Sequence, residues 1–317
     1  MPHDVGAKRA IAFVAGHDDQ GWIDALAAAM PHEHIIHNQD LRDEEAATVQ
    51  IAIVANPTPE QLLRYTGLRW VHSVWAGVER VLPMVAAQKI PLVRLIDPML
   101  AHTMGEAVLA WTLFLHRDMP AYAAQQRQRV WQPRPYRPPG EVTIGLLGLG
   151  EMGSAAAARL LAAGYRVCGW SQSVKKIEGV DAHTGEDGLR QVLQQADIVV
   201  VLLPLTPQTH TLLNAERLAL LKRGAALVNF ARGAVMDTDA LVVTLDAGAL
   251  SHAVLDVFAA EPLTPESALW HHPKITVLPH VSAPTDHTSA ARIVAANVAR
   301  YRADGVLPPT VDVMRGY

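Results

Sequence analysis

Short, continuously apolar runs rich in β-branched residues alternate along the whole chain with alanine- and leucine-rich stretches of helical periodicity. Such alternation is typical of parallel sheets covered by helices. In the first third of the chain, the pattern predicts helices over residues 22–30 and 59–65 and strands over residues 10–15, 51–55, 70–74 and 92–95. We therefore expect a small α/β domain at the start of the chain.

A second α/β set begins after residue 140. A single long helix is predicted over residues 105–129, followed by a proline-rich surface linker at 133–140. The later strands are predicted at residues 142–147, 166–169, 198–202, 226–230, 252–256 and 275–278, and the helices at 152–163, 189–195, 214–221 and 237–247. The last helix, 285–304, is expected to return to the first domain.

The predicted fold class is α/β, with two Rossmann-like or flavodoxin-like domains built on parallel sheets. A chain of 317 residues exceeds the size that one hydrophobic core usually serves, which also favours two domains. We expect one domain to comprise residues 1–99 and 285–317, and the other residues 100–284.

Composition narrows the class of partner. The 27 basic and 31 acidic residues give a formal charge of −4, which does not favour a nucleic-acid or membrane surface. Four arginines between residues 127 and 137, beside Trp131 and Tyr136, are interpreted as a solvated helix end and linker rather than a nucleic-acid patch. The fifteen histidines lack carboxylates or cysteines at a recognisable ligand spacing, so no metal site is predicted.

Cysteine usage and hydropathy bear on the compartment. The single cysteine, Cys168, excludes an intramolecular disulfide, fits a reducing compartment and falls in a predicted buried strand. The first sixteen residues lack the apolar run of a signal peptide, and no stretch reaches the ~20 apolar residues of a spanning helix. A cytoplasmic protein is expected.

A glycine-rich turn marks a candidate dinucleotide site. Residues 142–153 read VTIGLLGLGEMG, a buried strand that runs into a Gly-x-Gly-x-x-Gly pattern and then into a helix. Gly148 permits the tight turn, Gly150 lets the backbone approach a pyrophosphate, and Gly153 lets the helix pack close to the strand. The helix N-terminus, at Glu151 and Met152, would direct its N–H groups towards the phosphates. An ordinary glycine turn in a βα unit would not require this spacing.

The end of the next strand bears on the choice of cofactor. An NAD-preferring enzyme usually places an acidic residue there to bind the ribose 2′-hydroxyl. This sequence has Ser171-Gln172-Ser173-Val174-Lys175-Lys176, with two hydroxyls and two lysines that suit a 2′-phosphate. NADPH is therefore favoured and NADH stays possible, because Gln172 stands where a basic residue would strengthen the site. A polar surface loop is the alternative interpretation.

Three later strands are each followed by a polar side chain. The segments are Asn229-Phe230-Ala231-Arg232-Gly233, Leu255 to Leu263 (LDVFAAEPL) and Leu278 to Ala283 (LPHVSA). An arginine or histidine after a strand is by itself more often structural than catalytic. In open α/β sheets, however, ligands bind at the carboxyl ends of the strands, where these segments should meet.

Together with the glycine turn, these segments resemble the D-isomer-specific 2-hydroxyacid dehydrogenase family over nearly the whole chain. The Ser171 edge and the Trp75 loop are most similar to the NADPH-dependent glyoxylate/hydroxypyruvate reductases in it. The resemblance implies an active site in the interdomain cleft and a homodimer formed through the cofactor domain. It assigns Leu203, Pro204 and Thr206 to the adenosine half of the cofactor. It assigns Ala231, Asp256 and Ser282 to the nicotinamide side, with a turn-capping carboxylate as the alternative for Asp256.

The chemistry of ketone reduction supports the roles that the resemblance implies. Hydride addition leaves negative charge on the ketone oxygen, so a proton donor and a cation are needed nearby. His280 would donate the proton in reduction, and Glu261 would hold the far ring nitrogen and fix its tautomer. Arg232 would orient the substrate carboxylate and carbonyl.

The substrate loop and the substrate itself stay more open. Trp75, Ala76 and Gly77 are expected to bind the substrate, mainly through backbone N–H groups, although Trp75 could equally be a packed core aromatic. Dehydrogenases of larger 2-keto acids or of phosphorylated hydroxy acids are the close alternative, and a non-enzymatic NAD(P)-sensing corepressor is the remote one. We expect NADPH-dependent reduction of a small 2-keto acid such as glyoxylate or hydroxypyruvate.

Overall fold

The computed structural model describes residues 9–16 and 20–317, which form two compact units. The first unit combines the chain before residue 100 with Thr285–Tyr317, and the second is Leu100–Pro284. Residues 1–8, on which the expectation of no signal peptide partly depends, lie outside the described residues. Each unit carries its own parallel sheet, so the predicted α/β class is confirmed.

The first unit is built on a parallel sheet in the order β2-β1-β3-β4-β5. The strands are β1 (Arg9–Ala15), β2 (Glu33–His37), β3 (Ile51–Ala55), β4 (Trp70–Ser73) and β5 (Leu92–Val93). The residues of β3 are buried throughout, which explains their continuous apolar pattern, and β4 is equally buried although it ends in His72 and Ser73. This order is that of flavodoxin-like sheets.

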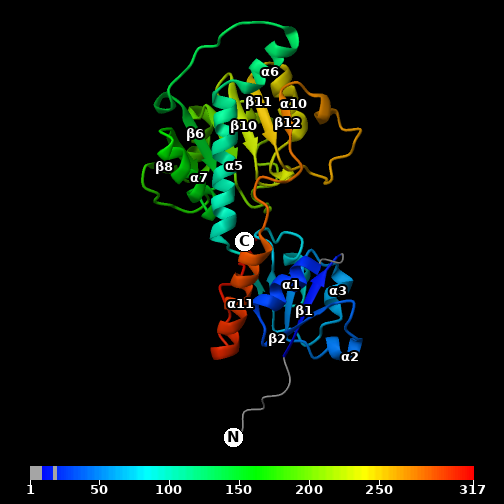
Figure 1. The fold of residues 1–317 in the computed structure, drawn as a ribbon. Helices are drawn as coiled ribbons and strands as arrows, with labels where there is room; N and C mark the ends of the chain where they lie inside the picture. Colours follow the sequence, from blue (N-terminus) through cyan, green and yellow to red (C-terminus); the bar gives the residue numbers. More distant parts are fainter. Residues whose placement is uncertain (1–8, 17–19) are drawn as a thin grey trace. The chain divides into compact units, whose positions relative to one another are not determined.

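Helices cover both faces of this sheet (Figure 1). Trp22 and Leu26 of α1 pack on one face together with Ala290 and Val294 of α11. The opposite face is covered by three short helices, α2 (Asp43–Ala46), α3 (Pro59–Leu63) and α4 (Leu82–Ala87). The other two helices are α1 (Gln20–Ala29) and α11 (His287–Asp304).

The C-terminal helix returns to the first unit, as predicted. The rings of Trp22 in α1 and His287 in α11 lie 4.3 Å apart between centroids. Arg302, near the end of α11, pairs with Glu33 of β2 through Nε to Oε1 at 2.9 Å. The two helices lie side by side in Figure 1.

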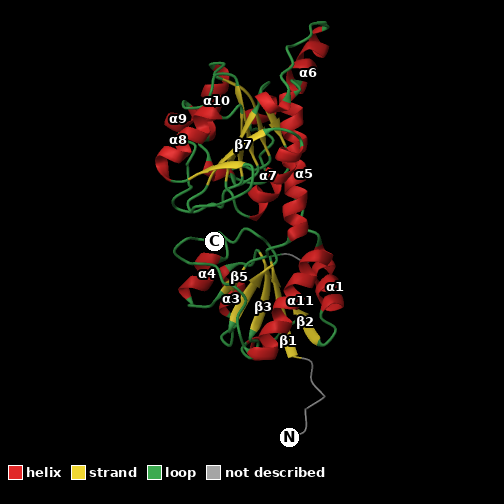
Figure 2. Ribbon diagram, turned by 90° about the vertical axis from the view of Figure 1, so that its left-hand side faces the viewer, coloured by secondary structure: helices red, strands yellow, loops and turns green. Residues whose placement is uncertain are grey.

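The second unit has a larger parallel sheet in the order β12-β11-β10-β9-β6-β7-β8. The strands are β6 (Thr143–Leu147), β7 (Arg166–Trp170), β8 (Val180–His183), β9 (Ile198–Val201), β10 (Ala225–Asn229), β11 (Leu250–Leu255) and β12 (Ile275–Val277). One face packs on α8 (Gly185–Gln195), α9 (Ala215–Leu218) and α10 (Thr238–Asp246). The other face packs on α5 (Pro98–His116) and α7 (Glu151–Ala162), and Figure 2 shows these layers. Short 3₁₀ turns lie at η1 (Pro139–Glu141), η2 (Gly233–Val235) and η3 (Ala268–His271).

The single helix expected over residues 105–129 is wrong. The chain instead forms α5, which ends at His116, and α6 (Met119–Gln128), with Asp118 in a left-handed conformation at φ 55° between them. Pro120 explains the break, because it lacks the N–H group that a continuing helix needs and its ring clashes with the carbonyl four residues earlier. The strands β2 and β8 and the helices α2 and α4 were also not predicted.

Two expectations about burial and hydropathy can be compared with the fold. Cys168 is buried in β7, as expected, and burial raises the pKa of its thiol to about 12, so the reactive thiolate is disfavoured. Within residues 9–16 and 20–317, no helix is both long and apolar enough to cross a membrane.

Candidate active site

The glycine turn after β6 is shaped by two close backbone contacts. Gly148 has φ +111°, and a Cβ atom there would lie 2.7 Å from the Leu202 carbonyl oxygen. A Cβ atom on Gly153 would lie 1.9 Å from the carbonyl oxygen of Gly148. Both positions therefore need glycine for the fold itself, as the motif predicts.

Gly150 differs from its two neighbours in the motif. It has ordinary extended dihedral angles, and a Cβ atom there would meet nothing within 4 Å. No contact within the described chain thus requires glycine at this position. Gly150 stands at the N-cap of α7 with no side-chain cap, which leaves space beside helical N–H groups. This is the geometry that suits a phosphate group at Glu151 and Met152.

The ends of the neighbouring strands lie beside this turn. The Gly148 N–H donates to the Trp170 carbonyl of β7 at 2.8 Å, which places Ser171 next to the turn. The Ser171 hydroxyl is buried and donates to the Ser173 carbonyl at 2.7 Å. Ser173, the second predicted hydroxyl, is exposed on the same loop. Three more of the predicted residues are exposed on this loop: Gln172, Lys175 and Lys176.

The loop after β9 is held by its own threonines. The Thr206 N–H donates to Thr209 Oγ1 at 2.8 Å, and that hydroxyl donates to the Pro204 carbonyl at 2.6 Å. Leu203 is buried beneath them. A shallow hollow is lined by Leu205, Thr206, Pro207 and His210, and its apolar rim is suited to a flat ring.

Three adjacent strands bring the predicted catalytic residues together. The order β12-β11-β10 places the segments of His280, Glu261 and Arg232 side by side at the carboxyl ends of these parallel strands. His280 Nδ1 lies 2.8 Å from Glu261 Oε2, and the other oxygen of Glu261 accepts the Phe258 N–H at 2.8 Å. The imidazole is half exposed, so its far nitrogen Nε2 can meet a ligand.

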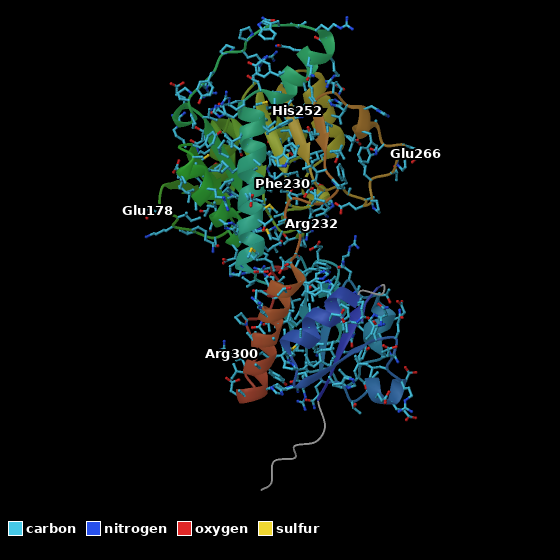
Figure 3. The ribbon with its side chains drawn as sticks, viewed as in Figure 1. Glu178, Phe230, Arg232, His252, Glu266 and Arg300 are labelled. Carbon is cyan, nitrogen blue, oxygen red and sulfur yellow. The ribbon has the colours of Figure 1, made fainter. Side chains whose placement is uncertain are left out.

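Close backbone packing brings Arg232 to this pair. A Cβ atom on Gly233 would lie 2.0 Å from the Phe258 carbonyl carbon, so the chain after Arg232 presses on the segment that leads to Glu261. Arg232 Nη1 donates to the Ala231 carbonyl at 2.7 Å. Arg232 lies where β10 ends, whereas His252, early in β11, lies towards the opposite end of the sheet (Figure 3).

Asp256 holds the histidine loop. Its side chain is only 2% exposed, and its two oxygens accept the N–H groups of Val281 at 2.8 Å and Ser282 at 2.9 Å. The His280 N–H donates to the Asp256 carbonyl at 3.0 Å, and His280 adopts φ +54°. The turn-capping interpretation of Asp256 is what these contacts show.

Asn229 is a residue to which sequence reasoning gave no role. It ends β10, is fully buried, and uses its side-chain amide on the turn that leads to Arg232. The signal that points to it is its position, a polar residue at the end of an otherwise apolar strand and three residues before an arginine.

The predicted substrate loop lies in the first unit. The Trp75 N–H donates to Ser73 Oγ at 3.0 Å, and its ring packs edge-on against Trp22 with 5.6 Å between centroids. Trp75 is thus partly buried at the border of the core that contains Trp22. Ala76 and Gly77 follow it as half-buried residues.

Among the described residues, no group of histidine, cysteine and acidic side chains could hold a metal ion.

Comparison with known proteins relates the chain to one family. Residues 109–282 match the model of the NAD-binding domain of D-isomer specific 2-hydroxyacid dehydrogenases. A glyoxylate/hydroxypyruvate reductase A of Yersinia enterocolitica is 34% identical over 302 residues, which cover 93% of this chain and 96% of the relative.

Two solved structures resemble the chain over almost its full length. A D-isomer specific 2-hydroxyacid dehydrogenase of Xanthobacter autotrophicus, in complex with NADPH and MES, has a TM-score of 0.91 and 37% identity, covering 98% of this chain and 100% of that one. An NADPH-dependent glyoxylate/hydroxypyruvate reductase of Sinorhizobium meliloti, in complex with NADP and sulfate, has a TM-score of 0.90 and 34% identity, with the same coverage of 98% and 100%.

Proposed function

Because the chain belongs to the D-isomer-specific 2-hydroxyacid dehydrogenase family, we propose that it reduces short 2-keto acids, glyoxylate and hydroxypyruvate in particular, with NADPH. One observation carries the proposal. The Glu261–His280 pair lies beside the arginine turn at the ends of adjacent strands, in the same sheet as the glycine turn.

The residues of the glycine turn fit a dinucleotide. Gly150 leaves open space at the start of α7, where helical N–H groups would bind a pyrophosphate without a side chain in between. The hollow at Leu205 and Thr206 suits the adenosine half, and Ser173 with Lys175 and Lys176 would bind a 2′-phosphate. Bound NADPH supplies the hydride.

His280 and Glu261 act on the proton. In reduction, the doubly protonated ring donates the proton on Nε2 to the carbonyl oxygen of the substrate, while the Nδ1–H is held by Glu261. Glu261 is itself fixed by the Phe258 N–H, so the ring keeps one orientation when it loses and regains its proton. In oxidation, the neutral ring takes the proton back at the same atom.

Arg232 orients the substrate. Its guanidinium can leave the Ala231 carbonyl and form a fork to the carboxylate of a 2-keto acid, whose carbonyl oxygen then points to His280. We propose that the main chain at Trp75, Ala76 and Gly77 also contributes to binding the substrate carboxylate. A bulky side chain at Trp75 would fit a short substrate better than a long one.

We also propose that the protein is a cytoplasmic homodimer formed through its second unit. Helix α6 buries none of its residues, and Trp131 just beyond it is 98% exposed. A second copy would cover the exposed apolar side chains of this region, which are Met119, Tyr122, Val130 and Trp131. Light scattering should report twice the mass of 34.3 kDa, and Trp131→Glu should shift the protein towards the monomer. An unchanged mass for the variant would place the contact elsewhere.

A panel of 2-keto acids assayed with NADPH and NADH tests the function. We expect the fastest NADPH oxidation with glyoxylate or hydroxypyruvate, and much slower rates with NADH. Turnover only with long or phosphorylated acids would overturn the proposed substrate, and equal rates with NADH would overturn the cofactor preference.

Two variants test the roles of the catalytic residues. His280→Ala should lose turnover and still bind NADPH, so near-normal turnover would exclude it as the acid. Arg232→Ala should raise KM and lower kcat together, whereas unchanged kinetics would place the substrate clamp elsewhere.

A further inference from the structure

We infer that Asn229 is a positioning residue that sets the direction of Arg232, an inference that rests on the proposed function. Asn229 is the last residue of β10 and is fully buried. Its side chain does not face the candidate ligand sites directly. It acts on the three residues that follow it, Phe230, Ala231 and Arg232.

Both halves of the Asn229 amide are used on this turn. Oδ1 accepts the Ala231 N–H at 3.1 Å, and Nδ2 donates to the Arg232 carbonyl at 3.2 Å. The turn therefore closes around one planar amide, which needs an acceptor and a donor at fixed positions. Of the side chains of this size, only asparagine offers both at neutral pH.

The rest of the turn is fixed on its other sides. The Asn229 carbonyl accepts the Asp256 N–H at 3.1 Å, which joins the end of β10 to the segment after β11 that contains Asp256 and Glu261. After Arg232, Gly233 presses against the backbone at Phe258. Arg232 is thus held extended, at φ −142° and ψ 145°, between two anchored points. Without the Asn229 side-chain amide, the turn loses the hydrogen bonds to the Ala231 N–H and the Arg232 carbonyl, and the guanidinium is no longer aimed.

The consequence for catalysis is a loss of orientation. A substrate carboxylate bound by a misdirected arginine presents its carbonyl poorly to His280, and small displacements of this kind reduce rates strongly. Asn229→Leu keeps the approximate size and removes both hydrogen bonds. We expect kcat/KM for the keto acid to fall about 10- to 100-fold, with KM raised and kcat lowered together. The Kd of NADPH should rise much less than the KM of the keto acid, because the glycine turn is not touched.

A double-variant cycle separates positioning from general destabilisation. When Arg232→Lys has already removed the forked contact with the substrate, adding Asn229→Leu should lower kcat/KM only slightly further. Asn214→Leu is the matched control, since the Asn214 side chain caps α9 by accepting the Arg217 N–H rather than bonding to the arginine turn. It should lower Tm and leave kcat and KM unchanged. Additive losses in the cycle, or a folded Asn229→Leu variant with wild-type kinetics, would overturn the inference.

Asn229→Asp provides a second test if the leucine variant does not fold. A protonated carboxyl can accept from Ala231 and donate to the Arg232 carbonyl as the amide does, whereas the carboxylate cannot donate. The ratio of variant to wild-type kcat/KM should therefore rise as the pH is lowered. A ratio that does not change with pH counts against the role.

Hydrogen exchange tests the turn without activity. A peptide spanning residues 229–233 should exchange faster in the variants, because the Ala231 N–H loses its acceptor. Unchanged exchange would overturn the inference. A wild-type protein inactive on every 2-keto acid would instead overturn the proposed function, and faster exchange in the variant would still support the turn geometry.

Discussion

Adding one methyl group at Gly150 or at Gly153 should have opposite effects on folding and on cofactor binding. A Cβ atom on Gly153 would lie 1.9 Å from the Gly148 carbonyl oxygen, which is a backbone atom and cannot rotate away. Helix α7 must therefore shift away from β6. Overpacking of this kind costs about 1–3 kcal/mol or more of unfolding free energy.

The same methyl group at Gly150 meets nothing within 4 Å, and the φ of −79° suits alanine. Replacing glycine by alanine at an N-cap lowers the unfolding free energy by a few tenths to about 1 kcal/mol. Alanine also reduces the conformational entropy of the unfolded chain, which raises the unfolding free energy by about 0.4–1 kcal/mol. Gly150→Ala should thus leave the unfolding free energy within about 1 kcal/mol of the wild type. It should weaken NADPH binding about tenfold or more, because a pyrophosphate can no longer approach the backbone.

Thermal unfolding and fluorescence titration with NADPH measure the two effects separately. About 2–4 °C of Tm is expected per kcal/mol for a unit of this size, so Gly153→Ala should lower Tm by several degrees. Gly150→Ala should keep its Tm and lose affinity. The reasoning is refuted if Gly150→Ala binds NADPH as tightly as the wild type, or if Gly153→Ala is as stable as the wild type.

Three further predictions concern other parts of the molecule. Glu261→Gln places an amide against His280 Nδ1 and favours the wrong ring tautomer, so kcat should fall about 100-fold or more while the affinity for NADPH is unchanged. A fall in kcat of less than threefold would contradict the role of Glu261 in holding the His280 ring. Replacing Lys175 and Lys176 by alanine together should raise the KM for NADPH about tenfold and leave that for NADH unchanged, whereas an equal rise for both cofactors would exclude a 2′-phosphate site there. Burial lowers the pKa of His72 to about 4 from 6.5, so the unfolded chain binds more protons between these values. The contribution of His72 to the unfolding free energy is then fully present above about pH 7, and about 3 kcal/mol of it is lost as the pH drops through this window. The unfolding free energy measured in urea should therefore depend less on pH in His72→Gln than in the wild type. An equal pH dependence in the two proteins would exclude His72 as the cause.

Much of the fold follows from local pattern. The buried strands β3, β9 and β10 read as continuous apolar runs because both faces of a parallel sheet are covered, and the pattern therefore locates them. The strands β2 and β8 were missed because they lie at sheet edges, where polar residues interrupt the pattern. The break between α5 and α6 depends on Pro120, a single residue whose effect the periodicity conceals.

The sequence by itself determined the residue types of the candidate site and their places after successive strands. The proximity of His280, Glu261 and Arg232 could be predicted because the carboxyl ends of parallel strands lie at the same end of a sheet, and the family resemblance implied their roles. Only the tertiary structure decided how they are held: Asp256 caps the histidine loop, Gly233 allows the close approach at Phe258, and Asn229 closes the arginine turn. These contacts join residues on different strands or across a turn, and their geometry depends on sheet register and backbone direction, which no local pattern encodes.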